Sequence, residues 1–359
     1  MKININNLLF MVAYGILLFK IAFANTTFVE YVDVRSVSWK FLYFISFSLI
    51  AIKIICVNQI STRNIVNCFL VLILGVIAFL YSQYTEIVAL VVLFIGMKGI
   101  ELKKVTKVFF FVYGSIMLIS LIASIFGIIE MFVVDSKVHG IRYSLGNVYP
   151  TDFSAGIFFM LLAYAFFCKK WYLFHYLVWT IVIILTFYFT KAQTSFILSI
   201  LFLVGFPFVR HINSLDITKS NLKNLLRIFS AISFPLLALL SYISVFLLNK
   251  GISLLSEINI LLNYRIGYLS NYLLNYGISL FGNSVEMVGA GWGTNNEQQY
   301  TYLDNGYFYV LILYGLLFGL FLFLGFSIVS LKSVNSLLHF ILILISLNAL
   351  LEPRFVNYL

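Results

Sequence analysis

Long apolar stretches alternate with short polar or charged clusters from one end of the chain to the other. Each stretch has at least about 15 residues, close to the 17–25 that a helix needs to cross a bilayer. The pattern predicts an all-α polytopic membrane protein with about eleven transmembrane helices. They are expected near residues 7–24, 39–57, 65–82, 86–100, 107–130, 153–168, 171–190, 193–210, 228–249, 304–330 and 336–351.

The composition agrees with this pattern. Of 359 residues, 62% are hydrophobic and 10% are charged, and the mean hydropathy is +1.03, whereas soluble domains are roughly 45–50% apolar and 25% charged. A soluble protein is excluded. No internal repeat is visible, nor a matched pair of Gly- or Pro-broken apolar segments of the kind that marks inverted-repeat transporters. We therefore expect residues 1–359 to form a single transmembrane domain.

The charge distribution indicates an orientation. With the amino terminus in the cytoplasm, 14 of the 23 Lys and Arg residues, but only two of the 13 Asp and Glu residues, fall on the inner side. Cytoplasmic loops of membrane proteins carry such an excess of basic residues. The net charge of +10 therefore reflects topology, and because the basic residues form no stripe, we expect no nucleic-acid partner.

The first apolar segment has a second interpretation. A basic residue at Lys2, an apolar stretch and the triplet Ala22-Phe23-Ala24 also fit a secretory signal with its cleavage site. Lys20 interrupts the apolar run where a signal should be most apolar. This position favours a retained transmembrane helix.

Cysteine and histidine give little sign of a metal or disulfide site. The three cysteines have no CxxC spacing, and the four histidines are far apart in the sequence. Neither a disulfide framework nor a zinc site is indicated, and we expect no cofactor.

Two long polar segments fall on the predicted outer side, at 131–152 and 250–303. Loops longer than about 12–15 residues are usually functional or disordered. These two contain too many Tyr, Leu and Gly residues for disorder. We therefore expect the functional site in these outer loops.

The first outer loop offers a possible phosphate site. Arg142 is a fixed cation, and Gly140 and Gly146 beside it allow backbone N–H groups to approach an anion. The alternative is a charge that reaches the membrane surface and binds nothing. Either Thr151 or Asp152 is expected to cap the helix that follows.

The second outer loop opens with a pattern that predicts a helix over 253–280. On a helical wheel Arg265 lies beside an aromatic stripe, which indicates an amphipathic helix at the membrane interface. The stripe is either an aromatic belt at the membrane surface or a sugar-binding face, since a guanidinium can bind a diphosphate through paired hydrogen bonds. Its tyrosines recur every four residues, at Tyr264, Tyr268, Tyr272 and Tyr276.

Other polar residues border the last two apolar segments. Asp304 and Asn305 either cap the tenth helix or face a ligand. Glu352 either forms an interfacial pair with Arg354 or lines the same outer cavity. A glycine and amide cluster at 289–299 is typical of turns, and its Glu297 is best explained as a solvated charge.

The chain carries four short motifs in order: Arg142-Tyr143-Ser144-Leu145-Gly146, Tyr149-Pro150-Thr151-Asp152, Tyr264-Arg265-Ile266 and Asp304-Asn305-Gly306-Tyr307 ahead of Tyr314-Gly315. In these motifs the chain resembles the bacterial O-antigen and capsular polysaccharide polymerases, the Wzy family, over nearly its whole length. The resemblance implies an integral-membrane glycosyltransferase of GT-C-like architecture at the outer face of the inner membrane. Such an enzyme transfers a growing chain from one undecaprenyl diphosphate onto a new lipid-linked oligosaccharide repeat.

The resemblance also implies residue roles. Family members depend on arginines in two outer loops, which match Arg142 and Arg265, and these are our candidate catalytic residues together with Asp304 as general base. Asp152 is the alternative base. The candidate substrate-binding residues are Tyr149, Asp152, Tyr268, Tyr272, Tyr276, Asn305 and Glu352.

The chain departs from the family at two places. Tyr149-Pro150-Thr151 stands where the family often has a His-Pro-Asn-like run, so a histidine base is unavailable there. Family members commonly carry a further transmembrane segment after the residue that matches Glu352, whereas this chain stops at Leu359.

Two other functions remain open, an O-antigen ligase and a lipid-linked oligosaccharide flippase or another transporter. A transporter would carry charged residues at mid-membrane depth, whereas the charges here cluster at segment ends. The sequence has no Asp-x-Asp motif, which predicts metal-independent transfer. A chain-length regulator and a flippase are partners that the resemblance alone implies.

Overall fold

The computed structural model describes residues 5–33, 36–57, 62–136, 140–168, 170–214, 221–289 and 301–358. Helices dominate this described part, and its one sheet is a two-stranded hairpin. The all-α class is therefore confirmed. Seven described helices are long and apolar enough to cross a membrane, and four shorter apolar helices accompany them. The count of eleven transmembrane helices stays a prediction.

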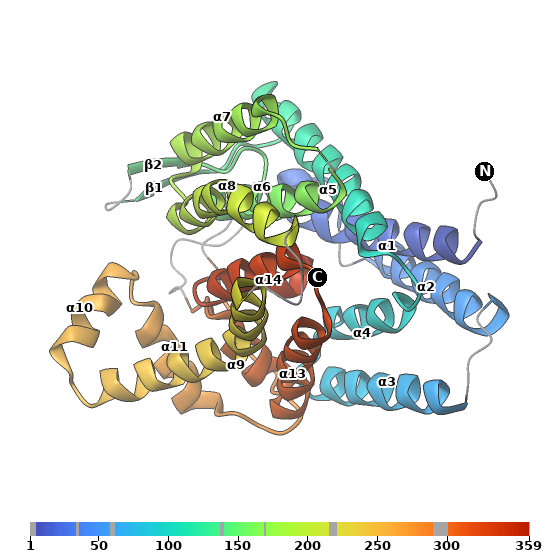
Figure 1. Cartoon of the computed structure of the whole chain (residues 1–359). Coiled ribbons are helices and arrows are strands. Elements are labelled where there is room, and N and C mark those ends of the chain that lie inside the picture. Colours follow the sequence, from blue (N-terminus) through green and yellow to red (C-terminus); the bar gives the residue numbers. More distant parts are fainter. Residues whose placement is uncertain are drawn as a thin grey trace. The chain divides into compact units, whose positions relative to one another are not determined.

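Each predicted apolar segment contains a helix in the structure (Figure 1). The helix boundaries lie within a few residues of the predicted ones, except in the ninth and tenth segments. The first nine helices are α1 (Ile5–Ala24), α2 (Val37–Ile52), α3 (Thr62–Ser82), α4 (Glu86–Gly96), α5 (Leu102–Ile125), α6 (Pro150–Phe167), α7 (Leu173–Thr190), α8 (Gln193–Ser214) and α9 (Asn221–Asn249).

The helices pack into two compact units. Unit 1 is drawn from Met1–Leu72 and Val88–Ile200, and unit 2 from Ile73–Ile87, Leu201–Gly289 and the described residues 301–358. The single transmembrane domain expected from the sequence stays a prediction.

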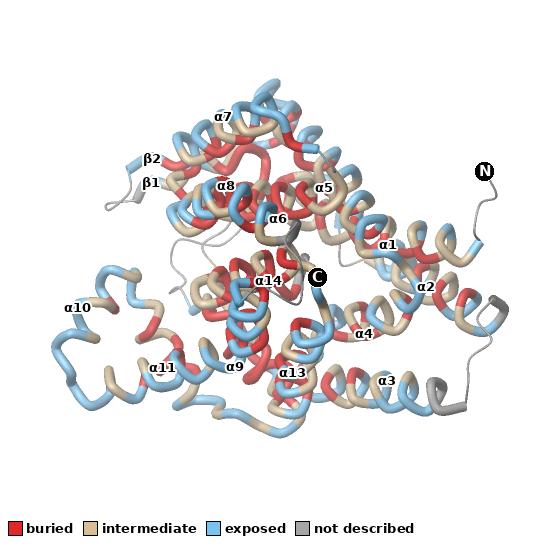
Figure 2. Tube along the Cα trace, in the orientation of Figure 1, coloured by how far each residue is buried: buried red, intermediate tan, exposed pale blue. Residues whose placement is uncertain are grey.

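In unit 1, α5 packs against both α1 and α6, and α7 packs against α6. Figure 2 shows α6 buried over most of its length, as expected for a helix that is apolar on all sides. By contrast, α7 exposes large apolar side chains such as Leu173, Phe174 and Ile181. An outward apolar surface of this kind suits contact with lipid.

The first helix is an integral part of unit 1. Its residues Phe10, Leu17 and Ala22 are buried, and it contacts α2 and α5. The ammonium of Lys20 lies 3.9 Å from the centre of the Tyr43 ring, a distance at which a cation is attracted to an aromatic face. Retention of this helix stays a prediction.

A buried lysine joins the end of α2 to the end of α4. Lys53 begins a short π-helix, η2 (Lys53–Val57), and is 1% exposed. Its Nζ donates to the backbone oxygens of Gly96 and Lys98, the latter at 3.1 Å. The last carbonyls of a helix have no partner within it, so Lys53 caps α4.

Replacing Lys53 with alanine is expected to lower the apparent melting temperature of the detergent-solubilised protein markedly. Each hydrogen bond from a charged donor contributes roughly 1.5–3 kcal/mol, and the substitution also leaves buried carbonyls without their donor. Lys104→Ala is the matched control, because Lys104 forms only an exposed pair with Glu101 at 3.3 Å, and exposed pairs contribute little. Equal melting temperatures for the two variants would contradict the capping role.

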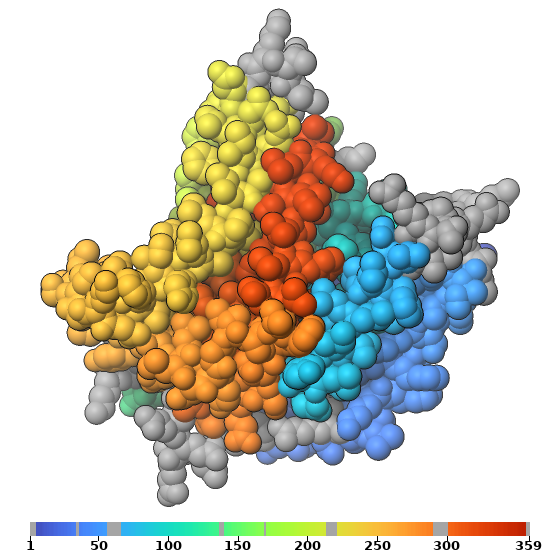
Figure 3. Space-filling model, turned by 90° about the horizontal axis from the view of Figure 1, so that it is seen from below, coloured from blue at the N-terminus to red at the C-terminus, as the bar shows by residue number. Residues whose placement is uncertain are grey.

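Unit 2 is organised around α9, which has 29 residues and is therefore roughly 44 Å long. Helices α13 (Leu316–Lys332), α14 (Ser336–Ala349) and α11 (Arg265–Tyr276) pack on it. Figure 3 shows yellow α9 lying along red-orange α13, with the orange residues that follow α11 against the end of α13.

The tenth apolar segment is not the continuous helix expected over 304–330. It consists of α12 (Gly306–Tyr309), a π-helix η4 (Val310–Tyr314) and then α13, with Gly315 at φ +89° between them. A positive φ ends a right-handed helix. The break follows from Gly315, which lies inside an uninterrupted apolar run and so leaves no trace in the hydropathy pattern.

A segment of the second outer loop satisfies the backbone groups freed at this break. The N–H of Asn283 donates to Ile312 O at 3.0 Å, and the N–H of Leu316 donates to Ser279 O at 2.9 Å. Gly282 lies between these bonds at φ +104°, with the backbone of Leu313 against it. Residues 279–283 are thus built into unit 2 as part of its framework.

Candidate functional site

The second outer loop contains two helices where the sequence predicted one. The expected helix over 253–280 is broken into α10 (Ser253–Leu261) and α11, separated by Asn263 at φ +53° and Tyr264 at φ +62°. These left-handed residues stop the helix and restart it in a new direction. The prediction of a continuous helix is therefore wrong, although the spacing within α11 is preserved.

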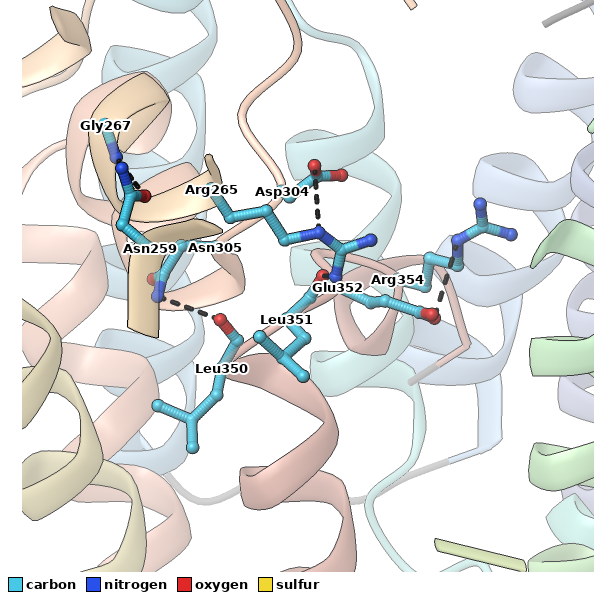
Figure 4. Close-up of polar contacts among 9 residues, drawn as sticks. All are labelled: Asn259, Arg265, Gly267, Asp304, Asn305, Leu350, Leu351, Glu352 and Arg354. Atoms are coloured by element: carbon cyan, nitrogen blue, oxygen red, sulfur yellow. Dashed lines mark hydrogen bonds and ion pairs between the residues drawn. The ribbon is translucent and has the colours of Figure 1, made fainter. Parts of the chain in front are cut away.

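A single asparagine of α10 fixes this corner. Its backbone oxygen accepts a hydrogen bond from Tyr264 N–H at 2.7 Å. The side-chain Oδ1 of the same residue, Asn259, accepts from Gly267 N–H at 3.0 Å, one of the backbone donors that a helix start leaves unpaired. Figure 4 shows this contact beside Arg265. These two hydrogen bonds fix the turn between α10 and α11, and with it the position at which α11 begins at Arg265.

Arg265 is held by two other segments of unit 2 (Figure 4). Its Nε lies 3.3 Å from Asp304 Oδ2, and its Nη1 donates to the backbone oxygen of Leu351. The side chains of Arg265 and Asp304 are 25% and 16% exposed. A planar guanidinium can bind two such partners at once, which an ammonium group at the same place cannot do with fixed geometry.

Asn305 has the structural role that the sequence left open. It is the N-cap of α12, and its Oδ1 accepts from Phe308 N–H at 3.1 Å. Its Nδ2 donates to Ser241 Oγ at 3.0 Å and to Leu350 O at 3.1 Å. The capping interpretation is confirmed. Substrate binding by Asn305 stays a prediction, but its amide is already engaged by three protein groups.

Replacing Asn305 with alanine is expected to lower the melting temperature clearly more than Asn335→Ala. Asn335 also caps a helix, with its Oδ1 accepting from Leu337 N–H at 3.0 Å, so it controls for the loss of a cap alone, about 1 kcal/mol. Asn305→Ala additionally removes one buried and one partly buried hydrogen bond, each worth roughly 0.5–1.5 kcal/mol. Equal shifts would show that the bonds to Ser241 and Leu350 contribute nothing.

Gly306 allows the start of α12 to lie directly on the end of α14. A Cβ at this position would be 2.9 Å from Glu352 O and 3.1 Å from Ala349 O. Asp304, Asn305 and Gly306 therefore each have a separate task in one junction. Asp304 pairs with Arg265, Asn305 binds the backbone oxygen of Leu350, and Gly306 permits close backbone contact.

A second charged pair follows α14. Arg354 Nε lies 3.8 Å from Glu352 Oε2, and their side chains are 17% and 5% exposed. The interpretation of Glu352 and Arg354 as a pair is thus confirmed, but the pair is largely buried. Arg354 was not among the predicted site residues, although its position two residues after Glu352 was visible in the sequence. Figure 4 shows this pair next to Arg265.

A pocket of about 410 Å³ runs along the exposed side of α11. This volume lies within the range of roughly 300–1,000 Å³ that is typical of small-molecule sites. The three predicted tyrosines of α11 line it together with residues that the sequence analysis missed. We call it the α11 pocket, and its lining residues are Tyr268, Asn271, Tyr272, Asn275, Tyr276, Glu286, Val288 and Thr301.

The tyrosines give the α11 pocket a rigid aromatic wall. The rings of Tyr272 and Tyr276 stack with centres 5.8 Å apart, and the Tyr272 hydroxyl donates to Thr301 O. Burial raises the pKa of Tyr272, with a smaller contribution from Asp304. The hydroxyl therefore stays neutral. The influence of Asp304 on Tyr272 also shows that this wall of the pocket lies near the Arg265–Asp304 pair.

The opposite side of α11 rests on protein. Ile266 and Leu269 are buried, and Ser270 Oγ donates to Asn249 Oδ1 of α9 at 2.9 Å. The amphipathic character predicted for this segment is present, with its buried face directed at α9.

The missed lining residues fall into two kinds. Asn271 and Asn275 are four residues apart and so share a helical face, which lies about 100° from that of Tyr272 and Tyr276. Their spacing was visible in the sequence. Glu286 and Thr301 lie in segments without regular secondary structure. No periodic signal could have placed these two.

Arg142 is buried in unit 1 and contacts protein groups. It lies in strand β2 (Gly140–Tyr143), opposite Val134 of β1 (Val133–Ser136), and is 8% exposed. Its Nε donates to Thr190 O at the end of α7, at 2.9 Å, where the helix dipole favours a cation. Its guanidinium lies 5.4 Å from the centre of the Tyr149 ring.

These contacts assign Arg142 and Tyr149 a structural role, and their catalytic and substrate-binding roles stay predictions. Gly146 permits close packing, since a Cβ there would lie 2.3 Å from Ser120 O, and its part in anion binding stays a prediction. His139 of the same loop lies outside the described residues.

The cap of α6 differs from the prediction. The N-cap residue is Tyr149, which makes no side-chain cap hydrogen bond, and Pro150 occupies the first helical turn. Thr151 and Asp152, expected as caps, lie inside that turn because the fixed φ of proline lets the helix start at Pro150. A carboxylate in the first turn is favoured by the helix dipole, which accounts for Asp152 without a ligand.

Comparisons with protein-family models, curated proteins and solved structures found no match. The helices therefore define the class, an all-α membrane-embedded protein. Within the described ranges, no three His, Cys, Asp or Glu side chains are grouped to hold a metal ion.

Proposed function

We propose that the protein is a polysaccharide polymerase of bacterial membranes. In this proposal it joins undecaprenyl-diphosphate-linked oligosaccharide repeats into an O-antigen or capsular chain. The amino terminus is cytoplasmic, and the site in unit 2 faces the periplasmic side of the inner membrane. The lipid-linked repeats serve as both donor and acceptor, and a flippase and a chain-length regulator are the proposed partners.

One observation supports this proposal best: a fixed guanidinium and a sugar-type pocket belong to the same helix. Arg265 begins α11, and Tyr268 of the α11 pocket follows one turn later, about 4.5 Å along the axis. Aromatic faces and amides suit the apolar ring faces and hydroxyls of a sugar, whereas a guanidinium suits a diphosphate. A polymerase must bind a sugar and a diphosphate at neighbouring positions.

In this proposal Arg265 stabilises the leaving group of the reaction. An acceptor hydroxyl oxygen attacks the anomeric carbon of the donor sugar, the bond from that carbon to the diphosphate oxygen breaks, and undecaprenyl diphosphate leaves with the electron pair. Negative charge therefore develops on the leaving diphosphate. A guanidinium already oriented by Asp304 and Leu351 stabilises this charge with little reorganisation.

Asp304 is the proposed base for the hydroxyl proton. Its Oδ2 lies 3.3 Å from Arg265 Nε, so the group that would accept the proton lies beside the group that would stabilise the leaving diphosphate. In this account Arg265 and Asp304 act together.

Deleting the gene and analysing the lipid-linked intermediates tests the proposal. We expect single repeats on undecaprenyl diphosphate to accumulate at the outer face of the inner membrane, with no long chains. Accumulation of complete long chains on the lipid would instead indicate a ligase. Repeats held at the cytoplasmic face would indicate a transporter.

A further inference from the structure

We propose that the α11 pocket binds the acceptor sugar of the incoming repeat and selects uncharged sugars over acidic ones through Glu286. This inference rests on the proposed function and names the class of sugar that its site accepts. It is carried by the chemistry of the pocket lining and by the way in which Glu286 is held there.

The lining combines the groups that recognise a neutral sugar. Tyr272 and Tyr276 supply a stacked aromatic wall, and Asn271 and Asn275 supply amides on the same side of α11. Sugars have apolar ring faces that pack on such aromatic surfaces and hydroxyls that bond to amides. A pocket of about 410 Å³ is at the small end of the range for ligand sites, roughly 300–1,000 Å³, which suits the end of a glycan.

The chain that carries Glu286 is fixed at two points. The Tyr84 hydroxyl donates to Val285 O at 2.9 Å. At the other end Thr301 N–H donates to Val288 O at 3.0 Å, and Val288 N–H donates to Thr301 Oγ1 at 3.2 Å. Val285 is 4% exposed whereas Glu286 is exposed, so the carboxylate lies on the pocket side of an anchored segment.

Tyr84 remains a neutral donor in this arrangement. Burial, and after it the charge of Glu86, raises the pKa of Tyr84 to about 12. Its hydroxyl therefore keeps the proton that binds Val285 O throughout the physiological range. The anchor of Glu286 does not depend on pH there.

Glu286 is the one charged residue among the described lining residues. A carboxylate accepts hydrogen bonds from two neighbouring sugar hydroxyls, and bonds to a charged group are the stronger kind. An acidic sugar would instead bring a second carboxylate against Glu286. No cation is among the described lining residues, so the like charges would meet without compensation there, which discriminates against the acidic sugar.

The test is a titration of the purified protein in nanodiscs with two free trisaccharides, followed by saturation-transfer NMR. One trisaccharide is entirely neutral, and the other differs by a uronic acid at its non-reducing end. We expect the neutral trisaccharide to bind at least about tenfold more tightly, which corresponds to about 1.4 kcal/mol. In Glu286→Gln the ratio is expected to fall close to one.

Two variants keep the test specific. Glu257→Gln removes an exposed carboxylate of α10 outside the pocket lining and is expected to leave the ratio unchanged. Tyr268→Ala removes a ring from the lining and is expected to weaken both sugars equally. Equal affinities in the unmodified protein, an unchanged ratio in Glu286→Gln, or no binding of either sugar would overturn the inference.

The two proposals fail in different ways. Preferential binding of the neutral trisaccharide by a protein that does not polymerise lipid-linked repeats would leave the pocket assignment standing and overturn the proposed function. Polymerisation by a protein without the preference would overturn the pocket assignment alone.

Discussion

Replacing Arg265 with alanine is expected to abolish the long-chain surface polysaccharide. Removing one oriented donor from a site where negative charge develops lowers rates roughly 100- to 1,000-fold. In the proposed mechanism Arg265 is such a donor, and it is held by Asp304 at 3.3 Å and by the backbone of Leu351. The measurement is the polysaccharide ladder of a deletion strain that carries the variant, in which we expect only core and single-repeat bands.

Matched variants separate the guanidinium from charge and from folding. Arg265→Lys keeps the charge but cannot hold both partners with fixed geometry, so we expect a short, weak ladder. Lys250→Ala removes an exposed cation of the same outer segment and is expected to leave the ladder intact. A full ladder from Arg265→Ala, at membrane levels equal to the unmodified protein, would show that Arg265 has no catalytic role.

Replacing Gly282 with alanine is expected to prevent accumulation of the folded protein. Gly282 has φ +104°, and a Cβ there would lie 2.0 Å from Leu313 O and 2.8 Å from its carbonyl carbon. Both atoms belong to the backbone at the helix break, so they cannot move aside like a flexible side chain. Backbone strain and overpacking each cost roughly 1–3 kcal/mol, and the substitution also disturbs the hydrogen bonds of residues 279–283 with the break.

Gly325→Ala is the control for this prediction. Gly325 lies within α13, and a Cβ there has nothing within 4 Å, so alanine is expected to be neutral or slightly stabilising, by up to about 1 kcal/mol. The measurement is the monodisperse fraction and melting temperature of each variant in detergent. A Gly282→Ala protein as stable as Gly325→Ala would contradict the tight junction described for unit 2.

Hydropathy located the helices because each apolar run is long. It could not show where the backbone leaves the helical conformation within a run. Gly315 breaks a helix inside continuous apolar sequence, and the partners that make the break possible, such as Ser279, are more than 30 residues away. The turn at Asn263 and Tyr264 was hidden in a similar way. Its left-handed residues are supported by Asn259, and one of them, Tyr264, is itself the first member of the four-residue tyrosine period.

The candidate site was predictable where it depends on helical spacing. Tyr268, Tyr272 and Tyr276 line one pocket because residues four apart share a helical face. The partner of Arg265 was not predictable from spacing, since Asp304 comes from another segment. The surroundings of Arg142 were not predictable either. Its guanidinium donates to Thr190 O, and no pattern in the sequence connects these two residues.

Reconstitution of the purified protein with lipid-linked repeats tests the central claim most directly. The reaction contains only undecaprenyl-diphosphate-linked single repeats in proteoliposomes, and the products are separated by size. We predict glycans of two or more repeats on one lipid, together with free undecaprenyl diphosphate in proportion to the bonds formed, and neither product with Arg265→Ala. Single repeats that stay unchanged with folded, correctly inserted protein would contradict the polymerase account.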